Sequence, residues 1–507
     1  MIMKKIKEIP WIHEEECAGC SVCVENCPMD CIAIEEPKFH GDIRTVARAD
    51  TSKCIGCGIC AKVCPIRAIE MRREGSMGGG SMEKERCESG VSRNGLKTRW
   101  TGKKVLCRIF QYGMKYAMYV LPWRVPKVLR GPGCVKKLPE AVKRRKFKKV
   151  LIVTDGTLME LGLLQGMLDA METADLPYVI YDGVAPNPTD ENVEEGVRLF
   201  RENHCDSMIA FGGGSPMDCA KGIGARIARP RKPVRKLQGL FRILRPVPMI
   251  FAVPTTAGTG SETTIAAVIT EAATHHKASM NDLCLMPKYA VLDPELTKGL
   301  PPRVTSTTGM DALCHAVEAY TNNTYNSRLE KEMCRRAVRL IYDNLYRAYT
   351  DGSDMEARQN MQEAAFLAGR AFTRGSVGYV HAIGHTLGGL YGTPHGLAMA
   401  VLLPHVMRAF GKAAHKKLAE LSDVCGLTGA DESIPEKAEA FIRWIEDLKI
   451  KMEIPDRLDM IREEDLDQIV EWAEKEGNPL YPVPVIWTRA EFKEFLKTCM
   501  ETGDSDR

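Results

Sequence analysis

The chain has 507 residues, of which 44% are hydrophobic and 27% are charged, which is the composition of an ordinary globular protein. Its formal net charge of +4 is too small to indicate nucleic acid or a membrane as the main partner. The sequence contains no apolar run of membrane-spanning length and no recognisable signal peptide. We therefore expect a soluble, cytoplasmic protein that is long enough for several domains.

Two cysteine runs near the start of the chain share the spacing C-x-x-C-x-x-C-x-x-x-C-P. The runs are Cys17, Cys20, Cys23 and Cys27, then Cys54, Cys57, Cys60 and Cys64. This spacing is typical of thiolates that bind a cubane iron–sulfur cluster. Zinc is the alternative, because C-x-x-C also binds zinc. The third cysteine at the same step and the proline after the fourth favour two clusters, with low-potential electron transfer as the default role.

Residues from about 10 to 72 resemble a bacterial two-cluster ferredoxin, on the two runs just described. The resemblance implies an α+β ferredoxin-like domain over residues 1–74, in which the fourth cysteine of each run binds the other cluster. It implies the ligand sets Cys17, Cys20, Cys23 and Cys64 for one [4Fe-4S] cluster, and Cys27, Cys54, Cys57 and Cys60 for the other. The other eleven of the 19 cysteines are scattered singly and predict reduced thiols, as in an anaerobe; we interpret Cys31 as a small core residue.

Residues 75–117 are predicted to be a linker, natural or introduced, because glycine, serine and charged residues fill its first part. Residues 118–301 then alternate helical stretches with short apolar strands at 150–153, 208–211 and 248–253. This alternation indicates a parallel α/β domain whose function lies at the carboxyl ends of the strands. From residue 302 to 507 helical periodicity dominates, so we predict an all-α domain there.

The predicted strand ends carry groups suited to a dinucleotide. Glycines in Gly212-Gly213-Gly214-Ser215 let the backbone approach a pyrophosphate at a helix N-terminus, although such turns are common. Residues 255–261 add hydroxyl and amide donors. Asp155 ends the first strand, where its carboxylate would accept from a ribose hydroxyl and so favour NAD(H) over NADP(H). The alternative for Asp155 is a helix cap.

A second group of residues has the spacing of a metal site. Asp311 and His315 stand four residues apart, as do His381 and His385, and His395 follows. Three imidazoles and a carboxylate suit Fe(II) or Zn(II). His405 has no partner in this pattern, so we interpret it as structural.

Residues from about 125 to 500 resemble the iron-containing (group III) alcohol dehydrogenases. The motifs that carry this resemblance are GGGSP at 212–216, PTTAGTGSE at 254–262, GMDALCHAVEAY at 309–320 and HAIGHTLGGLYGTPHGLA at 381–398. The implied architecture is dehydroquinate synthase-like: an NAD-binding α/β domain, an all-α domain, and a metal in the cleft between them. The implied metal ligands are Asp311, His315, His381 and His395, with His385 near the nicotinamide as a candidate for the proton path. The implied NAD contacts are Asp155, Asn187, Gly213, Gly214, Ser215, Thr255, Thr256, Thr259 and Lys277.

The resemblance implies a homo-oligomer that transfers a hydride between NAD(H) and a small alcohol or aldehyde, with Fe2+ (Zn2+ is the alternative) as a Lewis acid. Three roles for the clusters stay open: electron exchange with a flavoprotein or other redox partner, docking into an assembly, and a redox sensor or structural unit. The rival hypothesis is an electron-transfer subunit of a larger redox complex, in which the dehydrogenase half is a scaffold. No nucleic-acid partner is expected.

Overall fold

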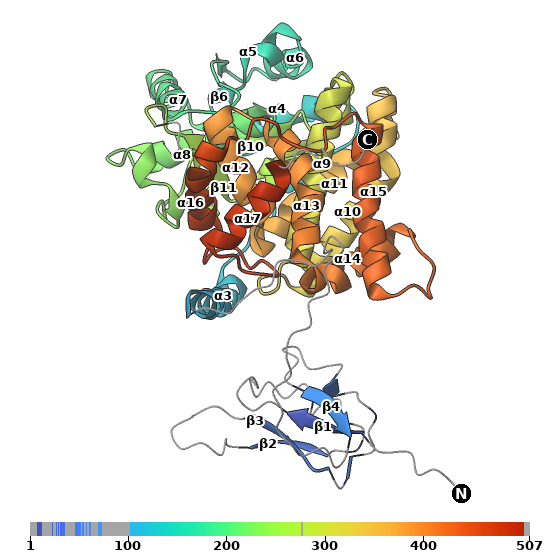
Figure 1. Cartoon of the computed structure of the whole chain (residues 1–507). Helices are drawn as coiled ribbons and strands as arrows, with labels where there is room; N and C mark the ends of the chain where they lie inside the picture. Colours follow the sequence, from blue (N-terminus) through green and yellow to red (C-terminus); the bar gives the residue numbers. More distant parts are fainter. Residues whose placement is uncertain are drawn as a thin grey trace, which may run out of the picture. The chain divides into compact units, whose positions relative to one another are not determined.

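A computed structural model describes residues 8–12, 23, 27, 29, 31–35, 46–51, 53, 54, 57, 60, 61, 69–73, 102–274 and 277–500 (Figure 1). The chain divides into two compact units, residues 1–91 and 92–507, and each is described by itself. Among the described helices, none is both long and apolar enough to cross a membrane.

Two antiparallel strand pairs make up the described part of the first unit. Strand β1 (Glu8–Ile12) pairs with β4 (Ile69–Arg73), and β2 (Ile32–Glu35) pairs with β3 (Val46–Ala49). Cysteines make up much of the small core, which contains Cys23, Cys31, Ile32, Ala47, Cys54, Cys60 and Ile69. The burial of Cys31 agrees with its interpretation as a core residue.

Helix α3 (Gly102–Val120) corrects one prediction, because residues 102–117 belong to the segment expected to be a linker. The run rich in glycine and serine, residues 75–81, ends well before the helix, whose own sequence has apolar residues at helical spacing. The helix is fixed to the second unit by side-chain hydrogen bonds. Gln111 is fully buried and donates to the carbonyl oxygens of Pro479 and Tyr481 at 3.0 and 2.8 Å.

A six-stranded parallel sheet, in the order β5-β13-β10-β8-β6-β7, forms the centre of the region predicted to bind a dinucleotide, which is called the nucleotide-binding region below. The strands are β5 (Lys127–Arg130), β6 (Val150–Val153), β7 (Tyr178–Tyr181), β8 (Ser207–Gly212), β10 (Met249–Pro254) and β13 (Tyr289–Leu292). The three strands predicted from apolar runs are thus present as β6, β8 and β10. They lie side by side at the centre of the sheet, where both faces are buried.

Helices cover both faces of this sheet. They are α4 (Leu138–Lys143), α5 (Gly156–Glu160), α6 (Gln165–Thr173), α7 (Asp190–Glu202) and α8 (Gly214–Ala228). Leu151 and Val153 pack with α7 and α8 on one face, whereas Val150 and Ile152 pack with α4 and α6 on the other. This alternation follows the two-residue repeat of a strand, and it explains why these strands are continuously apolar in sequence.

The order of the strands creates a switch point between β6 and β8. The chain leaves β6 and places β7 on one side of it, then returns to place β8 on the other side. Connections from these two strands therefore diverge, which opens a crevice at their carboxyl ends. A separate small sheet is built from β11 (Ala266–Thr270), β12 (Lys277–Asn281) and β9 (Gly239–Leu240), and its strand β11 packs against α8.

The described residues from 302 onward form helices and no strand. These helices are α9 (Pro302–Thr321), α10 (Arg328–Thr350), α11 (Met355–Gly375), α12 (Tyr379–Tyr391), α13 (His395–Phe410), α14 (Lys412–Cys425), α15 (Ile434–Lys451), α16 (Leu466–Gly477) and α17 (Arg489–Met500). Helix α9 lies at the centre, and every residue from 309 to 321 is buried. The predicted fold class is confirmed.

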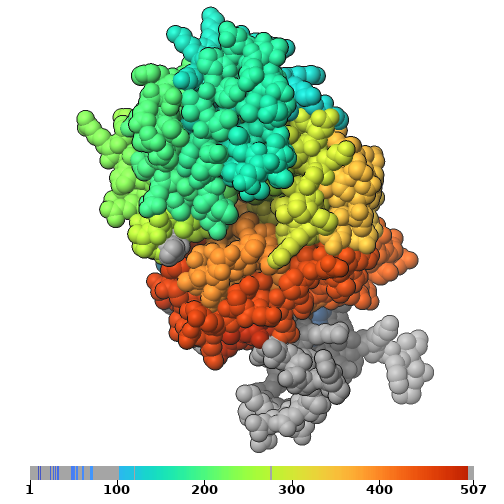
Figure 2. Space-filling model, turned by 90° about the horizontal axis from the view of Figure 1, so that it is seen from above, coloured from blue at the N-terminus to red at the C-terminus, as the bar shows by residue number. Residues whose placement is uncertain are grey.

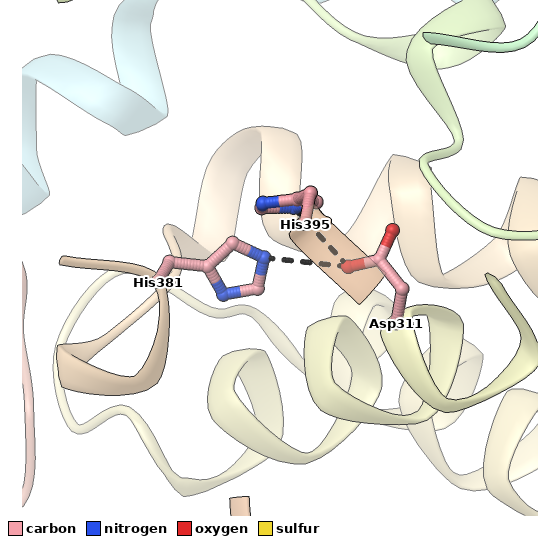
Figure 3. A group of neighbouring side chains, drawn as sticks. All are labelled: Asp311, His381 and His395. Atoms are coloured by element: carbon pink, nitrogen blue, oxygen red, sulfur yellow. Dashed lines mark ion pairs between the residues drawn. The ribbon is translucent and has the colours of Figure 1, made fainter. Parts of the chain in front are cut away.

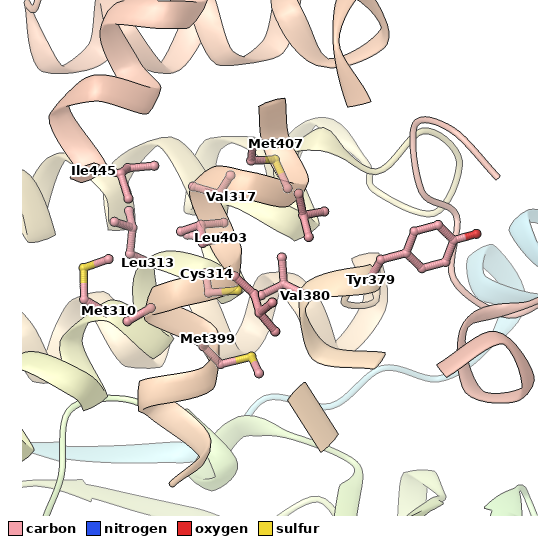
Figure 4. Close-up of a cluster of buried hydrophobic side chains, with 14 of the residues drawn as sticks. Met310, Leu313, Cys314, Val317, Tyr379, Val380, Met399, Leu403, Met407 and Ile445 are labelled. Carbon is pink, nitrogen blue, oxygen red and sulfur yellow. The ribbon is translucent and has the colours of Figure 1, made fainter. Parts of the chain in front are cut away.

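The core around α9 is shown in Figure 4. Met310, Leu313 and Val317 of α9 face Leu403 and Met407 of α13 within one buried cluster. A helix that is apolar on every side belongs in the interior of a large domain. The polar residues that α9 does carry are therefore buried with it.

Removal of one side chain from this core tests its contribution to stability. We expect Leu403→Ala to lower the free energy of unfolding by about 2–5 kcal/mol, because Leu403 is fully buried and its loss leaves a cavity. Urea unfolding followed by tryptophan fluorescence measures this change. The exposed Ile450→Ala on α15 is the matched control and should change stability by less than about 0.5 kcal/mol. Equal effects of the two substitutions would contradict the packing described here.

Candidate active site

The first two residues of the site are polar side chains of α9. Asp311 and His315 are one helical turn apart, and both are buried. Among the described residues, Asp311 Oδ1 and His315 Nδ1 have no hydrogen-bond partner, although both atoms are shielded from water. A buried carboxylate oxygen without a partner costs several kcal/mol, on the order of the full desolvation of that group. These two unpartnered atoms therefore indicate that the site binds a further group.

His381 and His395 come from the first turns of α12 and α13 and point toward Asp311 (Figure 3). Asp311 Oδ1 lies 3.8 Å from His381 Nε2 and 3.4 Å from His395 Nε2. It also lies 3.7 Å from His315 Nδ1. These separations are too long for hydrogen bonds, and they suit donors that share one ion at bonds of about 2.0–2.2 Å. Three imidazoles and one carboxylate fit Fe(II) or Zn(II).

Glu318 stands behind His381 and fixes its ring. The carboxylate of Glu318 accepts from the backbone N–H groups of Gly378 and Val380, both at 2.8 Å. Its Oε2 also lies 2.6 Å from His381 Nδ1. Burial lowers the pKa of His381 well below its usual value, so the ring is neutral and Nδ1–H donates to Glu318. His381 Nε2 then carries the lone pair, as a metal ligand requires, and it lies 2.9 Å from His315 Nε2 and 3.8 Å from Asp311 Oδ1.

A second set of metal-ligand atoms, from Cys314, Glu318 and His381, meets on the other side of the same ring. Cys314 Sγ lies 3.8 Å from His381 Nδ1. Burial raises the pKa of the Cys314 thiol well above its usual value, so the thiol keeps its proton. Since a metal binds the thiolate and Nδ1 is occupied by Glu318, this set supports His381 and does not form a separate metal site.

The crevice between β6 and β8 is lined by tight backbone turns. Gly212 has φ = 148°, and a Cβ at this position would lie 2.6 Å from Pro216 Cγ. A Cβ on Gly214 would lie 2.9 Å from Thr259 Cγ2. Gly213 is the N-cap of α8, so the free N–H groups of this helix open toward the crevice. Such a turn admits a phosphate where any side chain would block it.

One cavity joins this crevice to the histidine centre. Its lining includes Asn187, Gly214, Ser215, Thr259 and Lys277 from the nucleotide-binding region, together with His315, His381, His385 and His395. Figure 2 shows the nucleotide-binding region, mostly cyan to green, beside the helical region, yellow to red. The structure therefore brings both predicted groups of residues, far apart in sequence, to a single space.

Side chains of the nucleotide-binding region are held at this cavity by hydrogen bonds. Lys277 Nζ donates to Asn187 Oδ1 at 3.1 Å, and Ser215 Oγ donates to the carbonyl oxygen of Pro186. Burial lowers the pKa of Lys277, and the nearby carboxylates of Asp218, Glu476 and Asp311 act in the opposite direction.

The remaining predicted NAD contacts are outside the cavity lining, within the described residues. Asp155 is the N-cap of α5 and accepts from Leu158 N at 3.1 Å, as the capping interpretation predicted. It is half-buried at the end of β6, so it also stands where a ribose would lie. Thr255 N donates to Gly212 O at 3.0 Å, and Thr256 lies against Gly213. These two residues support the glycine turn.

His385 lies beside the candidate ligands and has a hydrogen-bond partner of its own, Glu476. Its Nδ1 lies 2.7 Å from Glu476 Oε1, and the same oxygen accepts from the Tyr481 hydroxyl at 2.7 Å. The ring of His385 stacks on that of His395, with centroids 5.2 Å apart. Burial raises the pKa of Tyr481 well above its usual value, so the hydroxyl remains a donor. Glu476 therefore sets the orientation of the His385 ring.

Sequence reasoning missed Glu318 and Glu476. Glu318 is part of the motif at 309–320 and follows His315 by three residues, so helical spacing alone places it beside the histidines. Glu476 had no such signal, because it lies 91 residues after His385 and belongs to no motif. His405 contacts the carbonyl oxygen of Asp456 at 3.0 Å, away from the site, in agreement with a structural role.

The first unit gathers the predicted ligands of one cluster. Burial raises the pKa of Cys60, and the nearby thiols of Cys54, Cys57 and Cys27 raise it further. These four cysteines are thus close enough to interact. Of the other predicted set, Cys23 is buried, and Cys17, Cys20 and Cys64 lie outside the described residues.

Comparison with family models decides the assignment of the second unit. A model described as iron-containing alcohol dehydrogenase matches residues 126–294, and one described as the C-terminal part of the Fe-containing alcohol dehydrogenase family matches residues 305–500. The chain belongs to the iron-containing alcohol dehydrogenase family. A model described as a 4Fe-4S dicluster domain matches residues 16–68. Both predicted resemblances are confirmed.

Relatives agree with this assignment. Alcohol dehydrogenase 4 of Schizosaccharomyces pombe is 39% identical over 414 residues, covering 80% of this chain and 93% of the relative. The 1,3-propanediol dehydrogenase of Citrobacter freundii is 40% identical over 72% of this chain and 95% of its own length. A crystal structure of 1,3-propanediol oxidoreductase superimposes with a TM-score of 0.72 at 36% identity, covering 75% of this chain and 100% of that one.

As an iron-containing alcohol dehydrogenase, the chain is an oxidoreductase whose cofactors are NAD(H) and iron, and its dicluster domain adds two [4Fe-4S] clusters. The side chains in the centre fit the iron on their own chemistry. Within the described residues, Asp311 Oδ1 and His315 Nδ1 are buried without a hydrogen-bond partner, and the neutral ring of His381 carries a lone pair on Nε2.

Replacement of Glu318 tests how the centre is held. We expect Glu318→Gln to weaken the retention of Fe2+ by about 10- to 100-fold, because an amide has one oxygen and cannot accept from His381 Nδ1 and from both backbone N–H groups of Gly378 and Val380. Titration with a chelator, followed by 57Fe Mössbauer spectroscopy, separates high-spin Fe2+ from cluster iron. The control is Glu420→Gln, because Glu420 also accepts from a side chain of α9, the Tyr320 hydroxyl. Retention equal to that of the unmodified chain would contradict the role given to Glu318.

Proposed function

We propose that this chain is an NAD-dependent alcohol dehydrogenase or aldehyde reductase that uses Fe2+, held by Asp311, His315, His381 and His395. One observation carries the proposal: the four side chains line the same cavity as the strand-end residues of the nucleotide-binding region, or border it directly. A cofactor bound along the crevice would therefore present its reactive end to the centre. Zn2+ is the alternative ion, because the same donors bind it.

When bound, the iron supplies Lewis acidity toward the oxygen of the alcohol or aldehyde, and NAD(H) supplies or accepts the hydride. Residues of the chain orient the groups of the site, exchange the proton and limit water. Glu318 holds the His381 ring in its orientation, and burial keeps that ring neutral. Glu476 occupies His385 Nδ1, so Nε2 of His385 is the atom that exchanges a proton with the substrate oxygen across the cavity. Met118, Phe372 and Leu480 add apolar lining that limits water.

We assign the nucleotide contacts to Asp155, Asn187, Gly213, Gly214, Ser215, Thr255, Thr256, Thr259 and Lys277. Asp155 stands beside the crevice with a charge that would repel a 2′-phosphate, which supports NAD(H) over NADP(H). Lys277, with its pKa lowered by burial and its Nζ held by Asn187, is placed to contact the nicotinamide end of the cavity. The substrate class is a small alcohol or aldehyde, and the similarity to 1,3-propanediol dehydrogenase supports short chains.

The clusters pose a separate question, because a cubane transfers one electron at a time and nicotinamide accepts a hydride. Coupling of the two requires a flavin or a similar converter. We propose electron exchange with a separate flavoprotein as the role of the first unit, and docking into an assembly as the second candidate. A redox sensor or inert structural unit ranks third. We propose a cytoplasmic location and a homo-oligomer, following the family resemblance.

The proposed function predicts independent dehydrogenase activity. We expect the anaerobically purified, Fe-reconstituted chain to oxidise NADH in the presence of short aldehydes, while the cluster absorbance stays unchanged. Asp311→Ala should abolish this activity and still bind NADH, measured by the fluorescence of the bound nucleotide, because Asp311 belongs to the metal centre alone. Cluster reduction by NADH in the isolated chain would require an internal converter. If no aldehyde supported NADH oxidation, the scaffold hypothesis would replace this one.

The proton path has its own test. We expect His385→Ala to lower turnover on the order of 10²-fold at normal Fe2+ content, because a positioned base is lost. Glu476→Gln should lower turnover less, and it should add no further loss in the His385→Ala background, since it acts through His385. Steady-state rates from pH 6 to 9 measure both effects. Turnover of His385→Ala equal to that of the unmodified chain across this range would remove His385 from the mechanism.

A further inference from the structure

Helix α3 precedes the region that the family model matches, which begins at residue 126. It is nevertheless fixed to the helical region by charged side chains. Lys104 forms an ion pair with Glu491 at 2.7 Å, and both side chains are largely buried. Arg108 donates to the carbonyl oxygen of Pro484 at 2.8 Å. The helix is therefore an addition of this chain to the family domain, and it has one defined position on that domain.

Further contacts of α3 reach a segment that lines the active-site cavity. Gln111 donates to the carbonyl oxygens of Pro479 and Tyr481 at 3.0 and 2.8 Å. Arg108 donates to the side-chain oxygen of Gln111 at 2.8 Å, which fixes the orientation of this amide. Leu480 and Tyr481 both line the cavity. The helix thus helps to determine where this part of the cavity wall stands.

Met118, in the last turn of α3, lines the cavity itself. Its side chain is buried, with 8% of the residue exposed. The indole N–H of Trp123 donates to the carbonyl oxygen of Met118 at 2.6 Å, so a residue beyond the helix holds its free end. Among the described residues before 126, Met118 alone belongs to the lining. This side chain is therefore the direct contribution of α3 to the site.

The apolar neighbours in the lining place Met118 on the substrate side of the cavity. Phe372 stacks on the ring of His315, with centroids 4.1 Å apart, so the apolar wall begins at the metal centre. The Tyr325 hydroxyl donates to the carbonyl oxygen of Leu480 at 2.9 Å, which joins two further members of the wall beneath α3. These residues belong to the helical region, across the cavity from the predicted nucleotide contacts. A substrate tail would therefore extend along this wall.

We propose that Met118 limits the length of the substrate, so that α3 gives this chain its preference for short alcohols and aldehydes. The inference rests on the proposed function, because it takes the substrate oxygen to lie at the metal centre. A carbon chain that extends from there along the apolar wall meets the Met118 side chain, and the anchored helix cannot withdraw it. Beyond Cβ, this unbranched side chain fills the space of about three methylene groups.

Steady-state reduction of propanal and hexanal by NADH tests the proposal. We expect Met118→Ala to raise the ratio of kcat/KM for hexanal to kcat/KM for propanal by about tenfold or more, because even one methylene in an apolar pocket changes kcat/KM by roughly tenfold. Met118→Phe should lower the same ratio, because its ring takes up more of the space. A residue that only stabilised the fold would not produce opposite changes with a smaller and a larger side chain.

Met114→Ala is the matched control, because Met114 lies one turn earlier on α3 and outside the cavity lining. It should leave the ratio unchanged. Binding of propanamide and hexanamide gives a second readout, since NADH does not reduce an amide and the fluorescence of bound NADH then reports binding without turnover. Met118→Ala should tighten the binding of hexanamide relative to propanamide by about tenfold as well.

Equal ratios in the unmodified chain, Met118→Ala and Met118→Phe would overturn the inference, and so would an equally large shift in Met114→Ala. Failure of the proposed function has a different signature, because no aldehyde would then support NADH oxidation by the unmodified chain. The two amides decide the role of Met118 in that case. An unchanged preference between them in Met118→Ala would overturn it.

Discussion

The helical region depends on the burial of one carboxylate. Asp311 lies in the middle of α9, where every residue from 309 to 321 is buried, and its Oδ1 faces three imidazoles and no hydrogen-bond donor at bonding distance. Such a group is costly unless a cation completes its surroundings. The imidazoles come from α9, α12 and α13, so whatever binds Asp311 also joins three helices. Metal binding and the packing of this region are therefore coupled.

A second buried charge organises the nucleotide-binding region. Lys221 of α8 is fully buried, and its Nζ has four acceptor atoms at 2.7–2.9 Å for its N–H groups: Ser261 O, Ser261 Oγ, Thr264 Oγ1 and Ala266 O. Burial lowers its pKa to about 8. Asp218, one turn earlier, accepts from Ser261 Oγ and Val268 N. These bonds tie the helix that follows the glycine turn to the loop that carries Thr259. Both walls of the phosphate crevice are therefore held by one network.

Cysteine has two separate uses in this chain. In the first unit, the thiols of Cys27, Cys54, Cys57 and Cys60 are close enough to influence one another. In the second unit, Cys134, Cys205, Cys219, Cys334, Cys425 and Cys499 are buried singly, and burial raises the pKa of each thiol. A buried protonated thiol is a small apolar side chain that does not react readily. These six cysteines therefore act as small apolar core residues.

The sequence alone determined the cluster spacing, the three central strands and the histidine pairs, because each depends on residues within one turn, one strand or one loop. Such short-range sequence patterns do not depend on how the helices and strands pack together. The sequence alone could not predict the role of Glu476, because only the packing of α16 against α12 places Glu476 beside His385. Sequence patterns also placed a linker where α3 stands, because glycine and serine preceding it resemble a flexible join. The tertiary structure determines which side of α3 faces outward. Its polar side faces inward because it contacts Glu474, Glu491 and the carbonyl oxygens near residue 480.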